Sequence, residues 1–176
     1  VSPVDLGENA RRDMVLTLED MGFEVESSHH ETAPAQHEIA LHYGEARKMA
    51  DEVMTFKMAV RTVAKRHGLH ATFMPKPRRE VNGSAMHIHF SLFKNGKNIF
   101  VDPDDPSKLS EEACFFIGGL LAHSREMALV TNPLVNSYKR IVPGNEAPAY
   151  IVWSSGNRSP LISVPRTSAK DMHIEL

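Results

Sequence analysis

Acidic and imidazole side chains gather at two places in this sequence, and the first group could hold a divalent metal ion. Glu31 and Glu38 end the runs 29–31 and 36–38, which we expect to lie on two strands joined by a tight turn. That turn would bring the two carboxylates together, and paired carboxylates repel unless a cation lies between them. Mg²⁺ and Mn²⁺ prefer such oxygen ligands. The alternative is a solvated hairpin end with scattered charges, which spacing alone favours.

His87, His89 and Ser91 form the second group, because alternate residues of a strand share one face. Two histidines in the pattern His-x-His are a common pair of metal ligands. A structural or merely exposed pair is the alternative, and spacing does not decide between the two.

Basic side chains and one further carboxylate lie in segments rich in glycine, proline and asparagine. Lys139, Arg140 and Arg158 could contact carboxylates or phosphates through their charge, although surface charge is the better interpretation of each one taken singly. Glu146 is either a positioned base or a turn residue. Acidic residues, paired histidines and loop arginines together indicate metal-assisted phosphoryl chemistry, without identifying the acceptor.

The elements that must position these groups can be predicted from periodicity and capping residues. We expect helices over 5–20, 45–67 and 110–127, with Gly22 and Gly68 ending the first two and Ser110 capping the third. Asn95-Gly96 indicates a hairpin turn leading to Ile99 and Phe100, and 132–148 is expected to be a long loop. Strands are expected over 23–29, 36–43, 69–74, 84–93, 150–153, 161–164 and 172–176. This irregular order favours an α+β fold with a largely antiparallel sheet flanked by helices.

Composition is that of an ordinary soluble domain of 176 residues with a formal charge of -2. Nothing marks it as a partner of nucleic acid, and we expect no apolar run to be long enough to span a bilayer. The single cysteine, Cys114, excludes an internal disulfide and fits a reducing cytoplasm. Because the chain begins at Val1 and stops at Leu176 within an expected strand, we expect it to be a fragment of a longer protein.

The sequence resembles the glutamine synthetase family in five blocks that follow the family's order over nearly the whole chain. The matching blocks are 30–38, 73–77, 82–91, 136–148 and 157–159. The resemblance implies the central part of the catalytic domain over 1–176, with a small N-terminal domain and the C-terminal end missing. It implies ATP-dependent ligation of ammonia to the γ-carboxylate of glutamate through γ-glutamyl phosphate. A ligase using a polyamine or other amine, and a non-catalytic relative, are the alternatives.

The resemblance also implies roles for individual residues, with two divalent cations (Mg²⁺ or Mn²⁺) as cofactors. Glu31 and Glu38 would hold one ion, and His87 and Glu175 the other. Glutamate and ammonium would meet Asn82, Gly83, Arg140, Glu146 and Arg158, of which Arg140, Glu146 and Arg158 would be catalytic. The residues implied around ATP are Glu26, His42, Tyr43, His89, Ser91, Arg158 and Lys170.

Three positions depart from the family pattern. Ser163 and His173 stand where arginines are expected, and Ala35 stands where glycine is usual. Fewer cations around a phosphate are expected to lower the rate, because such contacts act mainly on the transition state. The resemblance implies a double-ring homo-oligomer in the cytoplasm for the full-length protein, and we expect the isolated chain to be inactive.

Overall fold

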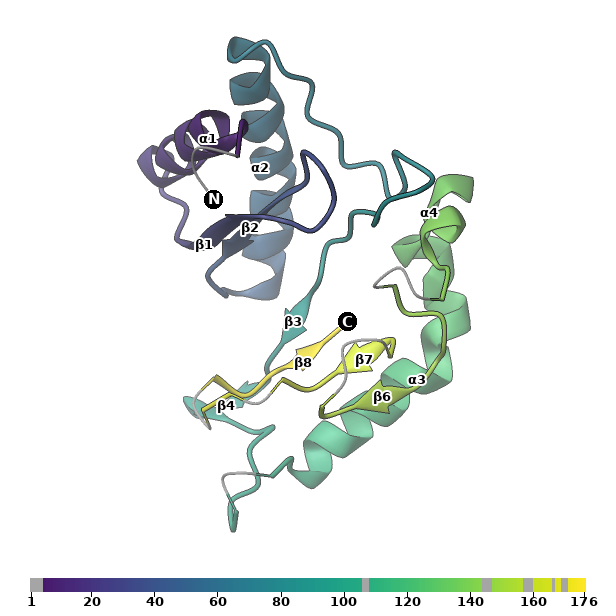
Figure 1. Cartoon of the computed structure of the whole chain (residues 1–176). Helices are drawn as coiled ribbons and strands as arrows, with labels where there is room; N and C mark the ends of the chain where they lie inside the picture. The colour runs from purple at the N-terminus through teal and green to yellow at the C-terminus, as the bar shows by residue number, and fades with distance from the viewer. Residues whose placement is uncertain (1–4, 106–107, 144–146, 157–159, 166, 169–170) are drawn as a thin grey trace. The chain divides into compact units, whose positions relative to one another are not determined.

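The computed structural model of the chain consists of two compact units, Val1–Phe73 and Met74–Leu176 (Figure 1). The structure describes residues 5–105, 108–143, 147–156, 160–165, 167–168 and 171–176. Helices and short strands mix in both units, so the predicted α+β class is confirmed.

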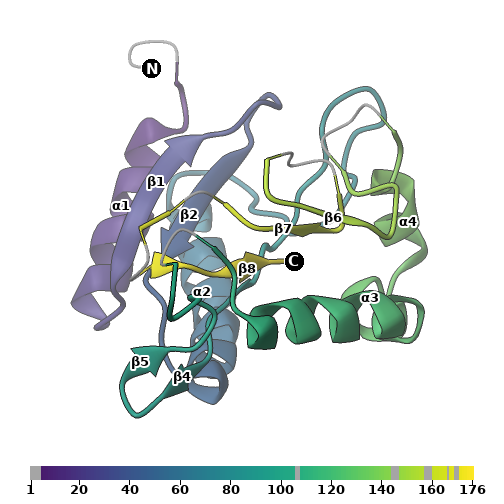
Figure 2. The same ribbon diagram turned by 90° about the horizontal axis from the view of Figure 1, so that it is seen from below.

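The first unit contains two helices and one β-hairpin. Its elements are α1 (Glu8–Asp20), β1 (Val25–His30), β2 (His37–Leu41) and α2 (Ala46–Arg66). β1 and β2 pair antiparallel, and α1 contacts both β1 and α2 (Figure 2). Leu18, Phe23 and Val63 are buried, so apolar side chains of both helices and of the segment before β1 form the interior of this unit.

The ends of the two helices follow the predicted capping residues. Gly22 and Gly68 have φ of 90° and 70°, a left-handed conformation that costs glycine little and that commonly ends a helix. Glu45 precedes α2, and its side chain accepts a hydrogen bond of 3.0 Å from the backbone N–H of Lys48. The predicted helices over 5–20 and 45–67 are confirmed, with starts that differ by one to three residues.

The second unit is built on a four-stranded sheet with the order β3-β8-β7-β6. Its strands are β3 (His89–Phe90), β6 (Trp153–Ser154), β7 (Ile162–Ser163) and β8 (Ile174–Glu175). β8 pairs antiparallel with both of its neighbours, while β6 and β7 are parallel. The sheet is therefore largely antiparallel, as predicted, with one parallel pair at its edge.

Helix α3 (Glu111–Thr131) packs on this sheet (Figure 2). Ser110 Oγ accepts a hydrogen bond of 3.1 Å from Ala113 N, which confirms the predicted cap. The buried core of the unit consists of Phe100, Ala113, Ile117, Ile162, Val164, Met172 and Ile174. The sequence therefore places the strands that carry Ser163 and Glu175 over a continuous apolar layer.

The hairpin predicted at Asn95-Gly96 joins β4 (Phe93–Lys94) to β5 (Lys97–Asn98). Asn95 and Gly96 have φ of 53° and 75°, as a tight two-residue hairpin turn requires. Asn98 then donates a hydrogen bond of 2.7 Å to Met172 O, which ties the hairpin to the segment before β8.

Four predicted elements need correction, and one of them is the strand expected over 150–153, of which only Trp153 lies in a strand. Residues 69–74, all described, form no strand, because apolar composition does not supply a neighbouring strand for their backbone groups. Only two short pieces of 84–93 are strand. The expected loop over 132–148 contains helix α4 (Val135–Arg140), whose start is supported by the hydrogen bond from Leu134 N to Ser137 Oγ.

In a strand over 84–93, the apolar residues that alternate with His87, His89 and Ser91 would share a buried face, but Met86 is 57% exposed and Leu92 is 41% exposed. Among residues 84–93, all described, Phe90 is the one that packs on the core cluster of this unit, with its ring 5.5 Å from that of Phe116. Period-two alternation predicts two faces along the whole segment, but only short pieces of it pair with another strand, namely His89–Phe90 with β8 and Phe93 with β5.

Helix α3 is long and apolar enough to cross a membrane by length and composition, contrary to our expectation from the sequence. The core helix of a soluble protein passes the same test. Length and composition alone therefore do not assign α3 to a membrane.

Candidate functional site

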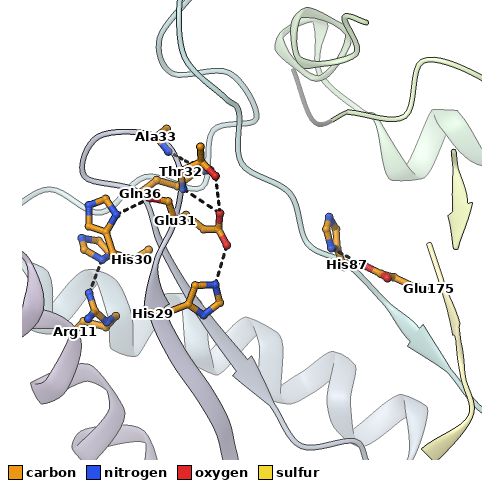
Figure 3. Close-up of polar contacts among 10 residues, drawn as sticks. Arg11, His29, His30, Glu31, Thr32, Ala33, Gln36, His87 and Glu175 are labelled. Carbon is orange, nitrogen blue, oxygen red and sulfur yellow. Dashed lines mark hydrogen bonds and ion pairs between the residues drawn. The ribbon is translucent and has the colours of Figure 1, made fainter. Parts of the chain in front are cut away.

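The end of the β1–β2 hairpin brings Glu31 and Glu38 together, as the sequence predicted. Cross-strand pairs join His29 to Glu38 and His30 to His37, and Glu31 N donates a hydrogen bond of 2.8 Å to Gln36 O. Gln36 N then closes the turn on Ala33 O at 3.1 Å (Figure 3). These contacts join residues that are close in the sequence. Only a short turn must therefore be ordered to hold the two carboxylates at one end of the hairpin.

Three ligand atoms converge at this hairpin end. One atom from each of His29, Glu31 and Glu38 lies within 4.8 Å of the others. His29 Nε2 is 2.8 Å from Glu31 Oε1, and Thr32 N donates to Glu31 Oε2 at 3.1 Å (Figure 3). Two carboxylates and an imidazole suit a divalent cation such as Mn²⁺. The sequence predicted no role for His29. Its place opposite Glu38 in the strand register is the feature that indicates a possible metal ligand.

The charge of Glu31 is fixed by its neighbours. Partial burial by itself would raise the pKa of this carboxyl, but hydrogen bonds from His29 and the Thr32 N–H bring the pKa below its ordinary value. Glu31 is therefore ionised at neutral pH and can act as a metal ligand without first losing a proton.

In the second unit, Glu175 of β8 is contacted by Ser163 of β7 and by His87, which lies just before β3. His87 Nδ1 lies 2.8 Å from Glu175 Oε1 (Figure 3), and Ser163 Oγ donates to Glu175 Oε2 at 2.7 Å. The hydrogen bond with His87 is the main cause that lowers the pKa of Glu175 to about 2, against the opposing effect of burial. The structure thus brings His87 and Glu175 together, as the resemblance implied. It adds Ser163, which the sequence had marked only as a lost arginine.

His89 lies beside the same carboxylate, opposite Glu175 in the register of β3 and β8, with its Nε2 4.0 Å from Glu175 Oε1. Its ring stacks on that of His173, with centroids 4.4 Å apart and planes at 15°. His173 Nδ1 is 2.7 Å from Asp171 O, which orients the ring. This stacked imidazole pair was not foreseen, because residues far apart in the sequence form it. Ser91, third in the predicted group, instead donates to Met172 O at 3.1 Å.

Asn82, Gly83 and Arg140 were expected to line the substrate. A Cβ atom on Gly83 would overlap Pro75 O and lie 2.9 Å from Arg140 Cγ, so only glycine lets these groups approach. Burial lowers the pKa of Arg140 from its ordinary value, yet an arginine stays charged at neutral pH. Gly83 and Arg140 therefore lie side by side, and Asn82 directly precedes Gly83 in the chain.

Helix α4, which ends at Arg140, is held by a pair of hydrogen bonds that the sequence did not predict. Asn136 Oδ1 accepts from Lys76 N at 2.7 Å, and Asn136 Nδ2 donates to Lys76 O at 3.0 Å. Lys76 Nζ in turn donates to Val81 O at 2.7 Å, which folds the segment leading to Gly83. These contacts join 76–83 to the helix that carries Arg140.

Of the residues expected around ATP in the first unit, His42 and Tyr43 stack with centroids 4.4 Å apart, and Glu26 is exposed on β1. His42 Nδ1 is also 3.6 Å from Glu24. Glu146, Arg158 and Lys170, to which the sequence assigned catalytic and nucleotide contacts, lie outside the described residues.

Comparison with known proteins agrees with this fold. All residues from 1 to 176 match the family described as glutamine synthetase, catalytic domain. The chain is 58% identical over 176 residues to the glutamine synthetase of Clostridium saccharobutylicum, covering 100% of this chain and 40% of that relative. It is 55% identical over 175 residues to that of Methanosarcina mazei, covering 99% and 39%.

A cryo-electron microscopy structure of Plasmodium falciparum glutamine synthetase matches with a TM-score of 0.94 and 34% identity, over 100% of this chain and 34% of that one. The matches in fold and in sequence define a catalytic domain of the glutamine synthetase type. The chain belongs to the glutamine synthetase family, and it spans about 40% of the length of the curated relatives it matches.

Proposed function

We propose that the protein carrying this chain joins ammonia to the γ-carboxylate of glutamate, with ATP converted to ADP and phosphate. The observation that carries the proposal is the match of all 176 residues to the glutamine synthetase catalytic domain. The acidic and imidazole clusters described above support it, since their side chains are of the kinds that such a reaction requires.

Two divalent cations, Mg²⁺ or Mn²⁺, are proposed as cofactors. Glu31 and Glu38 would hold one ion, and His87 and Glu175 the other. The donor sets fit, because Glu31 and Glu38 lie with His29 in one group of potential ligands, and the Glu175 carboxyl, with a pKa of about 2, is ionised. When bound, the ions supply positive charge that orients the phosphates of ATP and stabilises the charge that develops on them.

The proposed reaction has two steps. A γ-carboxylate oxygen of glutamate attacks the γ-phosphorus of ATP, the bond to the β-phosphate oxygen breaks, and ADP leaves with that electron pair. Ammonia then attacks the carbonyl carbon of the γ-glutamyl phosphate, and phosphate leaves with the electrons of the carbon–oxygen bond. Arg140 and Arg158 neutralise charge on the transferred group. Glu146 accepts the proton that ammonium must lose, and it belongs to a segment that keeps water from the acyl phosphate.

The substrate and nucleotide contacts follow the same assignment. We propose that glutamate and ammonium contact Asn82, Gly83, Arg140, Glu146 and Arg158. The close packing of Gly83 on Arg140 supports a fixed position for that guanidinium. For ATP, we propose contacts with Glu26, His42, Tyr43, His89, Ser91, Arg158 and Lys170. The full-length protein is proposed to work in the cytoplasm as a homo-oligomer.

A second candidate acceptor is an organic amine such as a polyamine. Ser163 and His173 favour it, since both stand at positions where the family resemblance leads one to expect an arginine. In the structure Ser163 hydrogen-bonds Glu175 and His173 stacks on His89. Fewer cations around the phosphate would set this site apart from the pattern that the resemblance implies, which is the reason to test a different acceptor.

Acceptor competition with the intact protein tests the proposal. Purified protein is given glutamate, MgATP and either ammonium or putrescine, and both released phosphate and γ-glutamyl product are measured. We expect one glutamine per phosphate with ammonium, and no phosphate release when glutamate is omitted. Product with putrescine but not with ammonium establishes the second candidate. Normally folded protein that releases no phosphate with either acceptor contradicts both.

A further inference from the structure

Arg11 of α1 reaches across to the hairpin that carries Glu31 and Glu38. Its Nη1 atom lies 2.7 Å from Asp5 Oδ2 and 2.7 Å from His37 Nδ1. The side chain of Arg11 is only 12% exposed and that of Asp5 only 3%, so the pair is not a solvated surface contact. His37 begins β2 and is joined through its peptide bond to Glu38.

Gly7 makes room for the imidazole of His37. A Cβ atom built on Gly7 would overlap Nε2 of the ring and lie 2.7 Å from its Cε1. The φ of Gly7 is -93°, which any residue adopts, so the backbone does not require glycine here. Gly7 N also donates to Asp5 Oδ1 at 3.0 Å. The space beside His37, rather than the conformation of the chain, therefore explains this glycine.

The hydrogen-bond roles follow from the chemistry of the groups. Arginine only donates, so His37 Nδ1 must accept, and the ring then carries its proton on Nε2. Burial, followed by the charge of Arg11, lowers the pKa of His37, which agrees with a neutral ring. On its other side, the ring meets that of His30 edge to face, with centroids 4.9 Å apart.

A metal ion at this place is the less favoured interpretation. Asp5, His30 and His37 do offer ligand atoms within 4.8 Å of one another. The Arg11 guanidinium already contacts two of these three side chains, however, and a second cation beside it would be repelled. Arg11 therefore supplies the positive charge that this group needs.

We propose that Asp5, Gly7 and Arg11 form a clamp on His37 that positions Glu38 and, through the hairpin register, Glu31. Successive side chains of a strand point to opposite faces, so His37 faces the clamp while Glu38 faces the proposed ion. His37 pairs with His30, whose Nδ1 is 2.6 Å from the backbone oxygen of Glu31. Arg11 is thus a positioning residue, and the inference rests on the proposed ion at Glu31 and Glu38.

Mn²⁺ binding to the intact protein tests the clamp, with one matched control. Arg11→Gln and Gly7→Ala are compared with Arg12→Gln, which changes an exposed arginine next in sequence. Loss of contacts that orient a ligand weakens metal affinity roughly 10-fold or more, so we expect that change for the first two variants and none for the control. The maximal rate at saturating Mn²⁺ should stay close to that of the wild type, and Arg11→Lys should recover part of the affinity.

The two ways of failing are distinguishable. Affinities of Arg11→Gln and Gly7→Ala within twofold of Arg12→Gln overturn the clamp while the proposed ion stands. Glu31→Gln serves as the reference for loss of the ion itself. If that variant binds as much Mn²⁺ as the wild type, the proposed metal site fails, and the clamp fails with it. A thermal unfolding curve for each variant separates altered ligand geometry from misfolding. Gly7→Ala also keeps every charge, so a loss of affinity in this variant is not caused by a lost charge.

Discussion

Ser163 Oγ, on β7, donates a hydrogen bond of 2.7 Å to Glu175 Oε2 on the neighbouring strand β8. Strand register places these residues directly opposite each other, so the contact fixes one carboxylate oxygen while His87 contacts the other. A position expected to hold an arginine for phosphate instead orients a proposed metal ligand.

Replacing Ser163 with alanine is expected to weaken binding of the ion proposed at His87 and Glu175. The change removes the hydrogen bond to Glu175 and leaves its carboxylate less constrained, which corresponds to roughly a 10-fold loss of Mn²⁺ affinity. Activity measured against Mn²⁺ concentration should show a raised half-saturation value. Ser163→Thr keeps the hydroxyl and should behave as the wild type does. Equal affinities for the alanine and threonine variants would show that the hydroxyl does not position Glu175.

Replacing Ala35 with glycine is expected to stabilise the hairpin turn. Ala35 has a φ of 59°, a left-handed conformation that costs an L-residue about 1 kcal/mol or more. Glycine relieves this strain but loses more entropy on folding, so the net gain in unfolding free energy should be about 0.5–1 kcal/mol. Ala40→Gly, in the middle of β2, is the control of opposite sign and should destabilise. Denaturant unfolding of the intact protein measures both, and a destabilising Ala35→Gly contradicts the strained turn.

Ser110 holds the start of α3 through two hydrogen bonds, accepting from Ala113 N at 3.1 Å and donating to Ile99 O at 2.6 Å. Ser110 is 3% exposed, so alanine at this position leaves Ile99 O and the Ala113 N–H without their hydroxyl partner. We expect Ser110→Ala to cost about 1–3 kcal/mol of unfolding free energy. Ser124→Ala removes a hydroxyl that bonds back to Leu121 O of the same helix and should change stability by less. Equal losses for the two variants would argue against the cap.

Glycines 83 and 119 should respond to alanine in opposite directions. A Cβ on Gly83 meets Pro75 O and the stem of Arg140, whereas a Cβ on Gly119 meets nothing within 4 Å. Gly83→Ala is expected to displace Arg140 and to raise the KM for glutamate, with a loss of stability. Gly119→Ala, inside α3, should raise the free energy of unfolding by about 1 kcal/mol through helix propensity and leave the KM for glutamate unchanged. An unchanged KM for Gly83→Ala would remove Gly83 from the substrate contacts.

Sequence reasoning succeeded where the decisive contacts are local. The close approach of Glu31 to Glu38 follows from one short hairpin, and Ser110 caps α3 within its first turn. The Asn95-Gly96 turn is likewise set by two adjacent residues. In each case the interacting groups are a few positions apart, so periodicity and turn chemistry are enough to predict them.

Contacts between distant residues were beyond what the patterns could predict. The link from Arg11 to His37 spans 26 positions, and that from Lys76 to Asn136 spans 60. The strand expected at 69–74 failed for the same reason, since strand formation depends on a partner elsewhere in the chain. The family resemblance did bring His87 and Glu175 into one proposed site, because it carries long-range information that spacing lacks.

Counting bound Mn²⁺ tests most directly whether this chain holds two separate ion sites. The intact protein is titrated with Mn²⁺ and the free ion is followed by electron paramagnetic resonance, for the wild type, Glu38→Gln and His87→Ala. We expect two ions per chain in the wild type and one in each variant, with the double variant binding none at the same concentrations. Variants that each retain both ions, or a wild type that binds a single ion lost only with Glu38, would contradict the assignment of one ion to Glu31 and Glu38 and another to His87 and Glu175.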